Sequence, residues 1–244
     1  MSKAGSGRGT SRHGITRAAT PTSRPAPGGS GLRAQPAEGN RDWDAHCVQF
    51  GQTPIEVGDR EFLTPASKDI VTLGGLNRAE AENIAVARLW LRDHPFDSTT
   101  DLLNQFALRD LHRRMFQRVW TWAGRLRLRE TNIGVDPAMI SQDWEVLLRN
   151  TEAQIDHGTY PAEEIGVRLH RSMLSIHPFM NGNGRHARIT ANELARLLGL
   201  GDDLYSWGRR SGEEHEAVRR KYLDALQLAD AEGQYGPLVA VALS

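Results

Sequence analysis

The sequence is poor in cysteine, has no long hydrophobic run and carries no excess of charge of either sign. Its single cysteine, Cys47, cannot form a disulfide within the chain, and there is no cysteine cluster for a structural zinc site. No apolar run approaches the roughly 18–20 residues of a membrane span, and the N-terminus lacks the apolar segment of a secretory signal. We therefore expect a soluble, cytoplasmic protein with no membrane partner.

The balance of charge argues against a protein whose main task is to bind nucleic acid. The 244 residues contain 30 Lys+Arg and 30 Asp+Glu, whereas affinity for a phosphate backbone needs a clear basic excess. Residues 1–40 differ from the rest, since they hold six basic groups, one acidic group, eight glycines and four prolines. They contain too few large apolar groups to offset the entropy of ordering. We predict a disordered basic tail over residues 1–45 and no specific nucleic-acid partner.

From about residue 77 onward, apolar residues recur at three- and four-residue spacing, which predicts a mainly α fold. Asn77 with Glu80 is a candidate capping box for the first long helix. A later helix should end at His177, because Pro178 disfavours helical geometry at the residue before it. We divide the chain into the tail, an N-terminal extension with the first helix over 46–100, a core over 101–210 and a C-terminal helix that packs on the core over 211–244.

Residues 124–136 interrupt the helical pattern. Leucine and arginine alternate at the start of this segment and are followed by Asn132 and Gly134, which together are a hairpin signal. The residues alone are equally compatible with an ordinary loop between two helices. We adopt a short β-hairpin as the prediction, with the loop as the open alternative.

One stretch of twelve residues, from His177 to Arg188, carries the chemistry. His177 should stand at the end of a helix, where its imidazole is a candidate base. Gly182 and Gly184 permit a sharp turn close to a ligand, and the helix that follows directs its free N–H groups into that turn. Such an arrangement favours an anion. Arg185 and Arg188 are one helical turn apart and can both hold phosphate oxygens.

These twelve residues resemble the signature of the Fic/Doc family, His-Pro-Phe-x-Asp/Glu-Gly-Asn-Gly-Arg-x-x-Arg, and depart from it at one position. Residues 111–124 resemble the upstream helix and Trp-Ala-Gly turn of the family, and residues 131–134 lie where the family has its target-docking flap. The resemblance covers about 105–200 well, and from about 50 to 235 the chain is similar to the subgroup called mobile mystery protein B. It implies a single Fic-like helical domain with a short β-hairpin flap.

The resemblance further implies a protein adenylyltransferase, which moves AMP from ATP to a Ser, Thr or Tyr hydroxyl of a target protein. By position, His177 would take the hydroxyl proton, a task suited to a group whose ordinary pKa is about 6.5. The residues that would hold the phosphates of ATP are Gly182, Asn183, Gly184, Arg185 and Arg188. The flap residues that would align the target by main-chain pairing are Asn132, Ile133, Gly134 and Val135.

The departure from the signature is Asn181, where the family has a carboxylate that binds Mg²⁺. An amide oxygen can coordinate this ion but supplies no negative charge, so the expected Mg²⁺ site is weak. The inhibitory pattern of the family, Ser/Thr-x-x-x-Glu-Gly/Asn, is absent from the sequence. The resemblance thus favours either an enzyme of low activity or a toxin held by a separate antitoxin-like partner, which in this subgroup would be a helix-turn-helix protein.

Three other functions remain open from the residues. The same loop could bind a nucleotide or phosphate without catalysis and act through a protein partner, which is the main alternative. A metal hydrolase would use His170, His177 and His186, although no acidic residue lies within the motif to complete a zinc site. The basic tail could also act as a nucleic-acid adaptor.

Overall fold

The computed structural model describes residues 57–244. The predicted tail over residues 1–45 and the predicted extension up to residue 56 lie outside the described residues. Helices dominate the described part, so the prediction of a mainly α fold is confirmed. Its elements, in chain order, are η1 (Val57–Phe62), η2 (Pro65–Ser67), α2 (Leu73–Asp93), α3 (Thr99–Leu102), α4 (Gln105–Phe116), α5 (Ile140–Asp156), α6 (Ala162–Ile176), α7 (Asn183–Leu197), α8 (His215–Glu232) and α9 (Gly236–Leu243).

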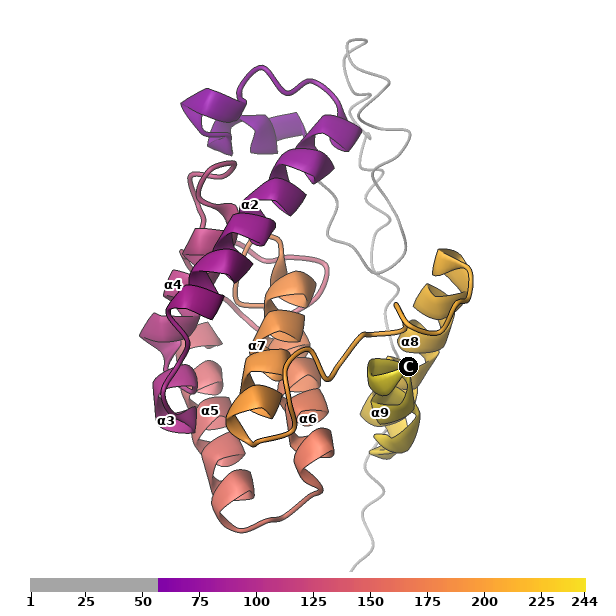
Figure 1. The fold of residues 1–244 in the computed structure, drawn as a ribbon. Coiled ribbons are helices and arrows are strands. Elements are labelled where there is room, and N and C mark those ends of the chain that lie inside the picture. The colour runs from indigo at the N-terminus through magenta and orange to yellow at the C-terminus, as the bar shows by residue number, and fades with distance from the viewer. Residues whose placement is uncertain (1–56) are drawn as a thin grey trace, which may run out of the picture. The chain divides into compact units, whose positions relative to one another are not determined.

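Helices α6 and α7 pack against each other at the centre of this arrangement (Figure 1). Helix α5 packs on α6, and α2 packs on α4. Along α7, the alanines at positions 187, 191 and 195 are fully buried, and such small side chains let neighbouring helix axes approach closely. Helices α8 and α9 pack on each other and lie on one side of the central pair (Figure 1).

Helix α2 begins earlier than predicted. Its N-cap is Thr72, whose hydroxyl oxygen accepts a hydrogen bond from the Gly75 N–H (3.1 Å). The predicted capping box of Asn77 and Glu80 is therefore wrong. Glu80 lies in the middle of the helix with only 2% of its surface exposed, and its carboxylate accepts a hydrogen bond from Nε1 of Trp120 (2.6 Å).

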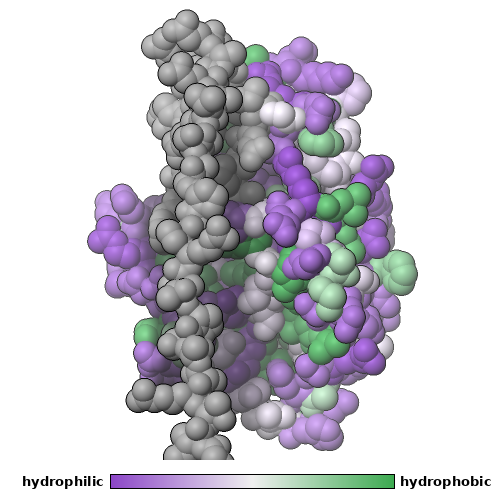
Figure 2. Space-filling view, turned by 180° about the vertical axis from the view of Figure 1, so that it is seen from behind, coloured by the Kyte–Doolittle hydropathy of each residue, from purple (hydrophilic) through white to green (hydrophobic). Residues whose placement is uncertain are grey.

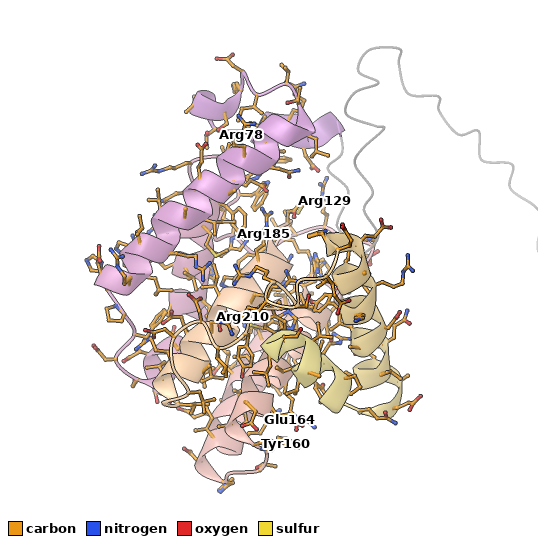
Figure 3. All side chains as sticks on the ribbon, turned by 45° about the vertical axis from the view of Figure 1, so that its right-hand side comes forward. Arg78, Arg129, Tyr160, Glu164, Arg185 and Arg210 are labelled. Carbon is orange, nitrogen blue, oxygen red and sulfur yellow. The ribbon has the colours of Figure 1, made fainter. Side chains whose placement is uncertain are left out.

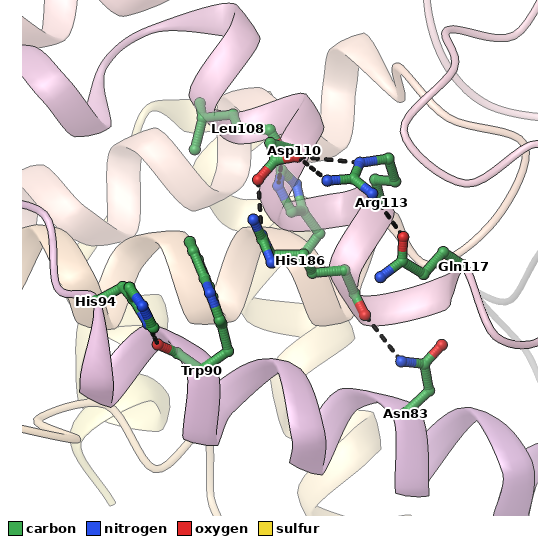
Figure 4. Close-up of polar contacts among 9 residues, drawn as sticks. Asn83, Trp90, His94, Leu108, Asp110, Arg113, Gln117 and His186 are labelled. Atoms are coloured by element: carbon green, nitrogen blue, oxygen red, sulfur yellow. Dashed lines mark hydrogen bonds and ion pairs between the residues drawn. The ribbon is translucent and has the colours of Figure 1, made fainter.

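Helix α4 is tied to the helices on either side of it (Figure 4). The Asn83 amide of α2 donates to the Arg114 carbonyl of α4 (2.8 Å). From the other side, Nε2 of the fully buried His186 on α7 donates to the Leu108 carbonyl (2.9 Å). Because each bond satisfies a buried polar side chain, the three helices keep a fixed relative position around the motif.

The segment over residues 124–136 does not form the predicted hairpin, and no β-strand occurs within residues 57–244. A hairpin needs N–H groups that bond across to its own second strand. Here the Arg127 N–H instead donates to the Pro178 carbonyl (2.9 Å), and the Val135 N–H donates to the Ile176 carbonyl (3.3 Å). The segment is a loop that bonds to the connection between α6 and α7.

A single guanidinium holds this loop in place. Arg127 is 2% exposed, and its Nε donates to the carbonyl of His177 (2.7 Å). Its Nη1 donates to the carbonyl of Arg129 (3.0 Å), while Nη2 donates to the carbonyls of Val135 and Ile176. A buried charge is costly unless it is hydrogen-bonded, and these carbonyls meet that requirement. Arg127 therefore joins both ends of the loop to the end of α6.

Hydrogen bonds of Tyr205 and a separate cluster of apolar side chains hold the C-terminal helices in place. The Tyr205 hydroxyl donates to the Glu163 carbonyl at the start of α6 (2.7 Å). The Asn192 side chain of α7 bonds both the N–H and the carbonyl of Tyr205. The ring of Tyr205 packs with that of Trp207, which in turn contacts Tyr222 on α8. These contacts place α8 beside the central helices.

On the face drawn in Figure 2, hydrophilic residues predominate and hydrophobic ones are interspersed among them. None of the helices within residues 57–244 combines the length and the apolar character that a membrane span requires.

We expect Arg127→Leu to lower the free energy of unfolding by roughly 3–5 kcal/mol, because carbonyls that now accept charged hydrogen bonds would be left buried without donors. Thermal and urea unfolding measure the loss. Arg125→Leu is the matched control, since Arg125 is exposed in the same segment. An equal, small effect of both substitutions would contradict the role given to Arg127.

Candidate active site

A cavity of about 680 Å³ lies among α2, the 124–136 loop, α6, α7 and α8. Two of the predicted site residues, Asn132 and Val135, do not line it. The nine predicted residues that the structure brings together on its wall are Ile133, Gly134, His177, Asn181, Gly182, Asn183, Gly184, Arg185 and Arg188.

The loop before α7 is a tightly braced turn. Gly182 has a left-handed backbone (φ 78°), and a Cβ at this position would lie 2.4 Å from the Phe116 ring, so only glycine fits. The buried Asn183 side chain bonds the Phe179 main chain twice, accepting from its N–H (3.0 Å) and donating to its carbonyl (2.8 Å). The side chain of Asn183, one of the residues predicted to hold the phosphates, is thus used to brace the turn. Helix α7 begins at Asn183, and its N-terminus favours an anion in the cavity.

The Asn181 side chain is also engaged within the turn. Its Oδ1 accepts a hydrogen bond from the Gly182 N–H (2.6 Å). The two carboxylates on the cavity wall, Glu80 and Asp230, each pair with an arginine. Mg²⁺ prefers several unengaged oxygen ligands with negative charge. These residues therefore do not fit a resident Mg²⁺ site.

His112, which the sequence analysis missed, supports the turn from α4. Its Nδ1 accepts from the Gly124 N–H (3.0 Å), so its Nε2 carries the proton that it donates to the Asn181 carbonyl (3.1 Å). The imidazole stacks on the Phe179 ring with centroids 3.6 Å apart. Burial, with the nearby His186 next in importance, lowers its pKa well below the ordinary value, and the ring stays neutral.

His177 follows the last residue of α6, as the sequence predicts, and it has a left-handed backbone (φ 51°, ψ 61°). This geometry is rare for residues other than glycine and costs about 1–3 kcal/mol, so the surroundings must impose it. The side chain lines the cavity although the residue is only 5% exposed. Burial and the charge of Arg127 lower the pKa of His177 to about 4, and a backbone hydrogen bond at Leu174 opposes them. His177 is therefore neutral at physiological pH.

The first motif arginine already has a partner. Nη1 of Arg185, near the start of α7 (Figure 3), forms an ion pair with Oε2 of Glu80 on α2, 2.6 Å away. Its guanidinium carbon lies 4.9 Å from the centroid of the Phe116 ring, the same ring that packs against Gly182. Glu80 thus holds Arg185 beside the turn, and it would compete with phosphate oxygens for the same guanidinium.

The loop residues at the cavity rest directly on His177. Gly134 has φ 113°, and a Cβ there would lie 2.7 Å from Cβ of His177 and 2.6 Å from Nη2 of Arg127. Ile133 is exposed at the cavity rim, and its carbonyl accepts from the Thr131 hydroxyl (2.6 Å). Glycine at position 134 is therefore required for the loop to cover the imidazole.

The three histidines of the metal-hydrolase hypothesis do not converge. His186 bonds to Leu108 in the core, and Nε2 of His170 lies 3.2 Å from the Tyr222 hydroxyl. Within residues 57–244, no group of three or more His, Cys, Asp or Glu side chains is placed to hold a metal ion. The structure does not favour that hypothesis.

Sequence reasoning missed the side wall of the cavity. Glu80 was interpreted as a helix cap, and the charges of α6 and α8 gave no signal that they face the motif. The missed polar residues on the wall are Asn77, Glu80, Arg171, Ser175, Arg219, Tyr222 and Asp230. Only the position of Glu80 inside the apolar stripe of its helix could have marked it as buried.

Solved structures with a similar fold are Fic domains. The N-terminal Fic domain of the effector Bep8 from Bartonella sp. 1-1C aligns with a TM-score of 0.58 at 17% identity, over 76% of this chain and 95% of that one. A Fic domain of a cell filamentation protein from Bartonella quintana, with bound ADP, aligns with a TM-score of 0.53 at 16% identity, over 72% and 86%. BepC from Bartonella tribocorum, with bound AMPPNP, aligns with a TM-score of 0.54 at 14% identity, over 76% and 96%.

At the level of sequence, no curated protein matches the chain. A family model does match, and its match spans residues 102–195, which run from the end of α3 through most of α7. This segment contains the braced turn, both motif arginines and His177. Residues 102–195 therefore match the Fic/DOC family model, and the solved structures with a similar fold are Fic domains.

Proposed function

We propose that the protein transfers AMP from ATP to a Ser, Thr or Tyr hydroxyl of a target protein. The observation that carries the proposal is the meeting, in one cavity, of a neutral histidine and an anion-binding turn with two arginines. The bound ADP and AMPPNP of two structurally similar Fic domains support a nucleotide as the ligand.

In the proposed reaction, the target hydroxyl oxygen attacks the α-phosphorus of ATP. The new P–O bond forms as the bond to the β-phosphate oxygen breaks, and pyrophosphate leaves. His177 accepts the hydroxyl proton and becomes an imidazolium. The backbone N–H groups at Asn183 and Gly184 face the α-phosphate, where the helix N-terminus stabilises the growing negative charge. Arg185 and Arg188 bind the β- and γ-phosphates.

A pKa of about 4 makes His177 a weak base in the free protein. Bound ATP changes this, because negative phosphates near the imidazole favour its protonated form and raise its pKa. The nucleotide thus helps to prepare the base that acts on it. We assign no step to a resident metal ion, and any Mg²⁺ carried by ATP belongs to the substrate.

The exposed rim at Ile133 and Gly134 is the proposed docking place for the target. An extended target segment can pair with main-chain groups there and bring its hydroxyl over His177, which Gly134 contacts. Main-chain pairing recognises backbone geometry, so several target sequences fit the same rim.

Two observations favour the second candidate, a nucleotide-binding module of low or no activity that acts through a protein partner. Glu80 occupies Arg185, and Asn181 leaves the turn without a carboxylate. The first feature weakens the hold on the phosphates of ATP, and the second weakens the hold on the Mg²⁺ that ATP carries. A separate helix-turn-helix partner that inhibits the protein as an antitoxin would be compatible with either candidate.

The test of transfer is labelling of proteins in a cell lysate by ATP with a radioactive α-phosphate. We expect His177→Ala to lower the labelling rate by roughly 10²–10⁴-fold, the usual contribution of a general base, while ATP binding persists. His157→Ala is the control, since His157 is exposed at the far end of α5. Parent protein that binds ATP yet labels nothing would favour the binding module.

The pH profile follows from the lowered pKa. Because His177 must be neutral to accept a proton, kcat/KM for ATP, which reports the protein before ATP binds, should stay level as the pH falls through 6.5 and decline only as it approaches about 4. A profile that already declines near pH 6.5 would contradict the burial argument for His177.

Glu80→Gln should tighten ATP binding by about tenfold, because the amide cannot hold Arg185 in an ion pair, whereas its oxygen still accepts from Trp120. Calorimetric titration with ATP measures the change. Glu82→Gln, an exposed position on the same helix, removes the same charge elsewhere and serves as the control. Unchanged or weaker binding in Glu80→Gln would show that Glu80 does not compete with phosphate.

A further inference from the structure

The four arginines on the cavity wall differ in how their charge is balanced. Arg185 pairs with Glu80, and Arg171 pairs with Asp230. Arg188 and Arg219 also line the cavity, but neither forms an ion pair with any residue of the described part of the chain. The uncompensated positive charge therefore lies where α7 faces α8.

We propose that Arg219 of α8 forms, together with Arg188 of α7, a two-guanidinium clamp for the terminal phosphate of a nucleoside triphosphate. The inference rests on the proposed function, which takes the same cavity as a nucleotide site. It adds a phosphate-binding residue from a helix that lies outside the Fic/DOC match over residues 102–195.

Tyr222 contacts the guanidinium of Arg188 and lies one helical turn from Arg219. The guanidinium carbon of Arg188 lies 4.9 Å from the centroid of the Tyr222 ring. Arg219 precedes Tyr222 by three residues on α8, so both side chains lie on the same face of that helix. Tyr222 is buried and packs against Trp207, which makes it a rigid support.

Both arginines are half-buried, and each has a buried donor that lacks an acceptor. The Nε atoms of Arg188 and Arg219 are buried and form no hydrogen bond with the described residues. Buried donors without acceptors are costly, and a phosphate group offers several acceptor oxygens of the right charge. The two like charges also repel, since burial and then the charge of Arg188 lower the pKa of Arg219. An anion between them removes that repulsion.

The order of the groups along the cavity selects the terminal phosphate. The braced turn at the start of α7 receives the reacting phosphate in the proposed function, and Arg185 stands in the first turn of the helix. Arg188 is three residues further on, about 4.5 Å along the axis, and Arg219 faces it from α8. A phosphate held by Arg188 and Arg219 is thus the one furthest from the turn.

The experiment compares the affinities of ATP and ADP, which differ by the terminal phosphate alone, in the full-length parent, Arg219→Gln and Arg220→Gln. Arg220 is the exposed neighbour on α8, so its substitution removes the same charge outside the cavity. We expect Arg219→Gln to weaken ATP binding by about tenfold or more and to change ADP binding by less than about threefold. Arg220→Gln should leave both affinities unchanged.

Two results would overturn the clamp. One is ATP affinity in Arg219→Gln equal to that of the parent, and the other is an equal loss for ATP and ADP. Arg219→Lys keeps the charge without the planar fork and should lose less ATP affinity than Arg219→Gln, which tests the clamp even if the glutamine variant unfolds. If the parent protein labels targets and either of these two results is found, only the clamp is rejected. If the parent protein binds neither ATP nor ADP, the clamp and the proposed function are both rejected.

Discussion

The buried guanidinium of Arg127 is the interaction on which the candidate site depends. It donates to carbonyls at both ends of the 124–136 loop and at the end of α6, including that of His177. A charged fork can satisfy several carbonyls at once, which no neutral side chain of similar size does. Burial is the main cause of the lowered pKa of His177, and the same charge lowers it further, so Arg127 sets the position of the loop and also favours the neutral form of the candidate base.

The charges around the cavity come partly from α2 and α8, which flank the segment 102–195 in the sequence. On the α2 side, Glu80 neutralises Arg185, whereas on the α8 side Arg188 and Arg219 keep their charge. The turn between them is rigid, because Gly182 packs against the Phe116 ring and the Asn183 side chain bonds both the N–H and the carbonyl of Phe179. The turn that we propose as the anion site therefore lies between a wall whose arginine is neutralised and a wall whose two arginines keep their charge.

Local patterns in the sequence predict the helices correctly. Side chains whose partners lie far away in the chain are the ones that these patterns misassign. Apolar spacing identified the helices, and Pro178 correctly predicted the end of α6 at Ile176. The hairpin prediction over 124–136 failed because alternation of Leu and Arg implies one apolar and one solvated face, yet Arg127 turned inward to carbonyls some fifty residues away. Glu80 was misassigned as a cap for the same reason, since its partner Arg185 lies 105 positions later.

The sequence by itself determined the mainly α fold, the resemblance to the Fic/Doc family and nine of the residues that line the cavity. It could do so because the turn, the helix start and the two arginines are neighbours in the chain, where spacing alone fixes geometry. Only the tertiary structure decided which charges around the motif are balanced, that Asn183 braces the turn, and that α2 and α8 form its walls. Those facts depend on contacts between helices far apart in sequence, and packing of the whole domain determines which of their faces meet.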